Sequence, residues 1–267
     1  MPLSLGDILN WAAGGIVFPL MMLPLAALIE GRRPGILPTI STGATVWIIL
    51  VLGTALAGME FVRAVPRLDL SESAKGGMFA FVGLVALQTL AIASFGGAAE
   101  STRTLARVFR FIAKTAGRIV MWLALAMGLL QFVVVILRYV FGVNFISMQE
   151  SLTYMHGAVF LIAAGYALLT DDHVRVDIFY RGLSDRGKAL VDFIGAYLFL
   201  FPVVLVILWT ASPYVGESWS VREGSAEQSG IQGVYLLKAL IPTFAILVAM
   251  AGFAMAAQAG ETLRRKR

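Results

Sequence analysis

Seven long runs of apolar residues constrain this chain more than any other feature. Crossing a hydrocarbon core of roughly 30 Å takes about 20 residues of helix. Runs near that length lie at 8–29, 42–62, 77–95, 119–140, 152–169, 189–211 and 234–257. Charged residues make up only 14% of the chain, against about 25% in a soluble domain. The sequence therefore predicts an all-α integral membrane protein with seven transmembrane helices.

Basic residues collect between alternate runs, and short cytoplasmic loops are the ones that keep lysine and arginine. They follow the first, third and fifth runs and end the chain, whereas residues 141–150 hold none and residues 212–233 hold one arginine and three glutamates. Residues 63–75 are a mixed exception. This alternation predicts the N-terminus on the outer side and the C-terminus in the cytoplasm.

The segment 101–118 has the pattern of an amphipathic helix lying in the cytoplasmic membrane interface. Its basic residues recur three or four positions apart, which places them on one helical side, with apolar residues opposite. We expect lipid headgroup contact from Arg103, Arg107, Arg110 and Lys114. A plain connector that carries positive-inside charge is the alternative.

Charged residues recur at the ends of the last four runs. They include Arg138-Tyr139, Glu150, the stretch His173-Val-Arg-Val-Asp177, and Lys238 at the start of the last run. In this order they resemble the small permease subunit, or DctQ family, of tripartite ATP-independent periplasmic (TRAP) transporters. Those subunits resemble four-helix membrane bundles with both ends in the cytoplasm, which agrees with the topology inferred from charge.

The resemblance implies a non-catalytic scaffold without cofactors in a bacterial inner membrane. Its implied partners are a large DctM-like permease subunit and an extracytoplasmic DctP-like binding protein, and its implied role is sodium-driven uptake of an organic acid, commonly a dicarboxylate. We expect three parts: a three-helix extension (1–100), the amphipathic connector (101–118) and a four-helix small-subunit domain (119–267). No nucleic-acid partner is expected.

Six charged residues are candidates for partner or structural contacts: Arg138, Glu150, His173, Arg175, Asp177 and Asp192. Arg138 either snorkels or contacts Glu150. Asp192 pairs with Lys188, four residues away, or meets a partner. Residues 171–181 form a short interfacial helix or a solvated connector. We predict no catalytic, substrate-binding or metal-binding residue.

Two other functions fit the helix count. The first is a self-contained carrier or receptor, although Lys238 lies at a helix end rather than at mid-membrane, where a retinal lysine is needed. The second is a membrane anchor of another complex, which must be free of cofactor because the only histidines, His156 and His173, lie about 25 Å apart along a helix and cannot bind one haem.

Overall fold

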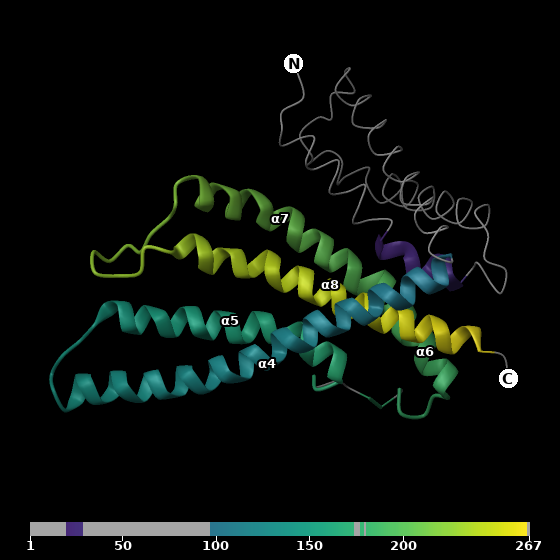
Figure 1. Ribbon diagram of the computed structural model, residues 1–267, viewed down its shortest axis with the longest axis horizontal. Coiled ribbons are helices and arrows are strands. Elements are labelled where there is room, and N and C mark those ends of the chain that lie inside the picture. The colour runs from purple at the N-terminus through teal and green to yellow at the C-terminus, as the bar shows by residue number, and fades with distance from the viewer. Residues whose placement is uncertain (1–19, 29–96, 174–176, 179, 266–267) are drawn as a thin grey trace, which may run out of the picture. The chain divides into compact units, whose positions relative to one another are not determined.

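The computed structural model describes residues 20–28, 97–173, 177–178 and 180–265, and all regular structure in these ranges is helical. The order is α4 (Ala98–Tyr139), α5 (Ile146–Thr170), α6 (Asp185–Gly195), the π-helical turn η1 (Ala196–Leu200), α7 (Phe201–Ser220) and α8 (Val234–Arg264) (Figure 1). The chain divides into two compact units, one of Ala106–Ala259 and one of Met1–Leu105 with Gly260–Arg267.

Four stretches are long and apolar enough to cross a membrane: Ala98–Tyr139, Ile146–Thr170, Asp185–Ser220 and Val234–Arg264. They contain the predicted runs 119–140, 152–169, 189–211 and 234–257 almost completely, so this part of the prediction is confirmed. The runs 42–62 and 77–95 lie outside the described residues, and within 8–29 only 20–28 is described, as helix. Seven transmembrane helices therefore remain a prediction.

Helix α4 crosses the boundary that we predicted at residue 118. Its 42 residues have a length of about 63 Å, twice the thickness of a hydrocarbon core. A Cβ at Gly117, next to that boundary, would clash with the Tyr166 ring. The absence of a side chain at Gly117 lets the Tyr166 ring pack against α4. The predicted connector and the following span are therefore one helix.

Helix α8 is the centre of the unit Ala106–Ala259. The α4–α5 and α7–α8 pairs form two antiparallel hairpins (Figure 1). Phe253 packs edge-on against Phe109 of α4 at 5.2 Å between ring centroids. A Cβ at Gly165 of α5 would lie 2.8 Å from the Leu247 carbonyl oxygen, and one at Gly252 would lie 2.5 Å from Leu200. Small residues thus let α8 approach its neighbours closely.

Helices α6 and α7 are joined through η1 without a break. The Phe201 N–H donates to the Ala196 carbonyl, five residues back, which is the hydrogen bond of a π-turn. Pro202 follows in the first turn of α7. Its missing N–H costs little there, because the π-turn has already interrupted the regular helical series of hydrogen bonds.

Candidate functional sites at the two ends of the helix unit

We call the end with the loops 140–145 and 221–233 the hairpin end, and the end with residues 171–184 the crossover end. At the hairpin end, Glu150 of α5 binds the loop that joins α7 to α8. One carboxylate oxygen accepts the Ile231 N–H at 2.6 Å, and the other accepts the Ser225 hydroxyl. These partners lie 81 and 75 residues along the chain. Glu150 therefore ties the two hairpins together.

The loop around Glu150 is folded on itself as well. The Ser225 N–H donates to the Ile231 carbonyl at 3.1 Å, and the Glu227 N–H donates to the Ser225 hydroxyl oxygen at 3.0 Å. A Cβ at Gly230 would clash with Ser225 and lie 2.7 Å from a Glu150 oxygen. Only glycine fits at residue 230, so the loop sequence is matched to the carboxylate that it binds.

A second carboxylate joins the two ends of the same loop. Lys238, in the first turns of α8, donates to Glu223, and its ammonium lies 4.1 Å from the ring centroid of Tyr214 in α7. The hydrogen bond from Lys238 holds the pKa of the Glu223 carboxyl below its usual value. The lysine side chain is only 16% exposed. This pair fixes the start of α8 relative to α7.

Arg138 and Glu150, for which we considered a mutual contact, have different neighbours. The Arg138 guanidinium lies 5.9 Å from the ring centroid of the adjacent Tyr139, and no ion pair joins it to Glu150 within the described ranges. Glu150 is used instead for the loop that joins α7 to α8. Of the two predicted residues, Glu150 is thus placed in a structural role inside this chain.

At the crossover end, Asp192 and Lys188 both meet Tyr180. The Tyr180 hydroxyl donates to an Asp192 carboxylate oxygen at 2.9 Å, and the Lys188 ammonium lies 5.7 Å from the centroid of its ring. From their spacing we predicted that Asp192 pairs with Lys188 or meets a partner. Tyr180, which the sequence analysis did not single out, brings the two together and holds the crossover against α6.

We considered a short interfacial helix or a solvated connector for 171–181, and the described residues of this segment form turns and irregular chain, as a connector would. Asp171 has a left-handed conformation, with φ 61°, and ends α5. The His173 Nδ1 lies 4.0 Å from an Asp171 oxygen, and the Arg181 Nε lies 4.0 Å from an Asp177 oxygen. Arg175 lies outside the described residues. His173 and Asp177 therefore make local contacts along the crossover.

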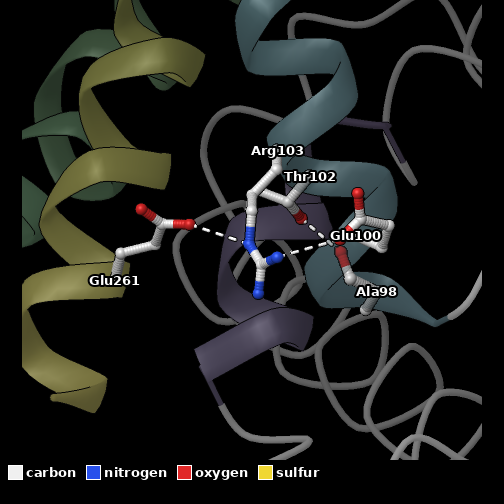
Figure 2. Close-up of polar contacts among 5 residues, drawn as sticks. All are labelled: Ala98, Glu100, Thr102, Arg103 and Glu261. Atoms are coloured by element: carbon white, nitrogen blue, oxygen red, sulfur yellow. Dashed lines mark hydrogen bonds and ion pairs between the residues drawn. The ribbon is translucent and has the colours of Figure 1, made fainter.

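Arg103, one of the predicted lipid contacts, binds carboxylates of the chain (Figure 2). Its guanidinium lies 2.9 Å from Glu100 in the same helix and 2.9 Å from Glu261 near the end of α8. The neighbouring Thr102 hydroxyl donates to the Ala98 carbonyl at 2.6 Å. Arg103 thus joins the first turns of α4 to the last turns of α8. Among the other three residues, Arg107 and Lys114 are exposed and Arg110 is half-buried.

The described residues hold no group of three or more histidine, cysteine or acidic side chains that could bind a metal ion. Glu150, Glu223 and Lys238 lie near helix ends or in a loop between helices. Their contacts position helices and loops.

Residues 127–266 match the family model of the DctQ component of tripartite ATP-independent periplasmic transporters. The chain belongs to the DctQ family. The match covers more than half of the chain and takes in α5 to α8 with the latter part of α4. No curated protein and no solved structure matches the chain. DctQ proteins are small membrane subunits of TRAP transporters, a transporter component rather than an enzyme.

The sequence analysis missed several residues that complete these sites: Ser225, Ile231, Glu223, Tyr180 and Glu261. Opposite charges on Glu223 and Lys238, at the two ends of one loop, are a sequence signal for one of these contacts. The contacts of Ser225 and Ile231 with Glu150 have no such signal, because one is a hydroxyl and the other a backbone N–H.

Proposed function

We propose that this chain is the small membrane subunit that holds the large permease subunit of a TRAP transporter during sodium-driven uptake of an organic acid, commonly a dicarboxylate. The family match over residues 127–266 carries the proposal. The large subunit provides the transport path, and an extracytoplasmic binding protein delivers the substrate. This chain contributes a frame that does not itself move.

The distribution of charge supports a frame rather than a carrier. The central parts of the four described spans, at 119–137, 151–170, 193–216 and 239–260, contain no aspartate, glutamate, lysine or arginine. A path for ions or organic acids usually requires ionisable side chains at membrane depth. Glu150 and Lys238 lie near helix ends, and each bonds to another part of this chain.

We place the hairpin end on the outer side of a bacterial inner membrane and the crossover end in the cytoplasm. The crossover end carries Arg181, Arg186 and Lys188, whereas the loop at 221–233 carries one arginine and two glutamates. The same rule puts the C-terminus in the cytoplasm and, with seven spans, the N-terminus outside.

We propose that the chain has a three-helix extension at 1–100, a connector at 101–118 and a four-helix domain at 119–267. Continuity of α4 means that the connector is joined to the four-helix domain without a flexible link. We propose that the extension widens the membrane footprint of this frame.

Co-purification from the native membrane tests the function. A tagged full chain should retain a large polytopic permease at near-equal amount, identified by mass spectrometry. Membranes in which the gene is deleted should lose uptake of the organic acid, and the intact gene should restore it. A chain that purifies alone and binds a solute would instead be a self-contained carrier or receptor. A chain that retains a different complex would be its membrane anchor.

A further inference from the structure

The part of α4 from Ala106 to Trp122 joins a basic segment directly to a transmembrane segment. Arg118 is followed by Ile119, which begins an uncharged run that ends at Leu137 and is close to the roughly 20 residues that span a bilayer. Because the helix is continuous, its last basic residue lies at the boundary of the hydrocarbon core. This placement follows from covalent structure and needs no assumption about the partner.

Packing inside the unit Ala106–Ala259 fixes which side of this segment faces outward. Ala106, Ala113 and Val120 are buried on one side. On the same side, Phe109 contacts Phe253 and Gly117 lies against Tyr166. The helix cannot rotate about its axis without losing these contacts, so its remaining sides stay exposed.

The exposed sides carry two kinds of residue next to each other. Arg107, Lys114 and Arg118 are seven and four residues apart and share one side of the helix. Phe111, Ile119 and Trp122 share the adjacent side, and Phe111 is 69% and Trp122 74% exposed. A basic row beside an apolar row is the pattern of a helix at a membrane surface.

We propose that this surface binds anionic phospholipid, with Lys114 and Arg118 contacting the headgroups and Ile119 and Trp122 contacting the acyl chains. Arg118 lies at the hydrocarbon boundary and Lys114 about 6 Å further along the axis, within a headgroup layer that is roughly 5–8 Å thick. Arg107, about 16 Å from Arg118 along the axis, reaches the headgroups only if α4 tilts toward its apolar side.

Arg103, by contrast, is a basic residue of α4 whose charge is neutralised within the chain. It lies between two carboxylates at 2.9 Å each. Lys114 and Arg118 are exposed and pair with no carboxylate of the described ranges. An anionic lipid supplies the missing negative charge at the height where these two residues lie. Lipid binding at this surface does not depend on which solute the complex carries.

Fluorescence quenching of Trp122 by brominated lipids tests the proposal in the full chain. Trp11, Trp47, Trp209 and Trp219 are replaced by phenylalanine, which leaves Trp122 as the reporter. The protein is reconstituted in phosphatidylcholine vesicles with small amounts of brominated phosphatidylglycerol or brominated phosphatidylcholine. Each basic residue near an anionic surface contributes about a fivefold preference, so we expect Lys114 and Arg118 together to favour phosphatidylglycerol roughly 25-fold.

The substitution K114Q/R118Q should bring the preference near unity, whereas the charge-preserving exchange K114R/R118K should retain it. R222Q removes one positive charge from the loop at the hairpin end and serves as the matched control with unchanged preference. Added salt should also reduce the preference for phosphatidylglycerol in the protein that keeps Lys114 and Arg118, because exposed charges are screened beyond about 10 Å at 0.1 M. This salt experiment uses the protein with Lys114 and Arg118 intact, so it remains informative even if K114Q/R118Q does not fold.

Two outcomes would overturn the proposal. The first is a preference for phosphatidylglycerol that persists in K114Q/R118Q or at high salt. The second is equal quenching by both lipids together with loss of a co-purified protein in K114Q/R118Q, which would assign this surface to an acidic protein partner.

Discussion

Helices α8 and α4 are both long and apolar, but they are surrounded by different material. Within the chain, 39% of the most apolar stretch of α8 is buried, against 6% for α4. Buried residues of α8 include Ala245, Ala251, Phe253 and Ala254, whereas no residue of 121–139 is buried. Apolar sequence alone thus does not distinguish a helix that forms the core from one whose neighbours are lipid or another subunit.

The largest difference between α8 and α4 should appear when a glycine packed against α8 and a glycine of α4 are each replaced by a larger residue. Gly165→Leu would force side-chain atoms against the backbone of Leu247 in α8, where even a Cβ lies 2.8 Å from the carbonyl oxygen. We expect a loss of about 1–3 kcal/mol or more in the free energy of unfolding, as for overpacked cores. Thermal unfolding in detergent measures it.

Gly128→Leu is the matched control on α4. A Cβ at Gly128 has no atom within 4 Å, so the stability of the isolated chain should change by less than about 0.5 kcal/mol. Equal losses for the two variants would contradict the assignment of α8 as core and α4 as periphery.

Glu150→Gln should loosen the loop that leads into α8. The substitution removes the charge from both acceptor bonds, and charged acceptors make the stronger bonds. We expect several-fold faster amide hydrogen exchange in residues 225–231, measured by mass spectrometry. Glu227→Gln, in the same loop, should leave exchange unchanged, and so should any substitution on the exposed side of α4. Unchanged exchange in Glu150→Gln would mean that the loop is held by its internal bonds alone.

Acid should act on the start of α8 through Glu223. Its pKa is lower in the folded chain than the ordinary 4.5, so its stabilising contribution is present above pH 4.5 and is lost as the pH falls through the folded value. Exchange of residues 221–238 should therefore accelerate below pH 4.5. Lys238→Met should accelerate exchange at neutral pH and weaken this acid dependence. If residues 221–238 of the wild-type chain show the same exchange at pH 3.5 and pH 7, after correction for the intrinsic exchange rate, Glu223 does not stabilise this loop.

The smallest effect is expected at the crossover end. Tyr180→Phe removes the hydroxyl that donates to Asp192 at 2.9 Å, a loss of about 0.5–1.5 kcal/mol in unfolding free energy. Tyr139→Phe, at an exposed residue at the end of α4, is the control and should be neutral. Equal unfolding midpoints for both would show that Tyr180 does not fasten the crossover.

The four described spans could be predicted because their length and lack of charge have a direct physical cause in the bilayer. The contacts at the helix ends could not be predicted in this way, because Glu150 bonds to a hydroxyl and a backbone N–H that lie more than 70 residues away in the sequence. Gly117 illustrates a further limit. The residue type permits either a break in a helix or the close approach of another side chain, and only the position of Tyr166 decides.

The π-turn Ala196–Leu200 sets the angular register of the third described span. The buried residues on either side of this turn are Ala189, Phe193, Ala196, Phe201 and Val204, so the steps between them are four, three, five and three. The step of five would turn Phe201 away from the buried side in a regular helix, since each extra residue rotates the helix by about 100°. The wider turn absorbs that rotation. Deleting one residue there would leave a regular helix of the same orientation, whereas deleting one elsewhere in α7 would turn every following side chain toward a different neighbour.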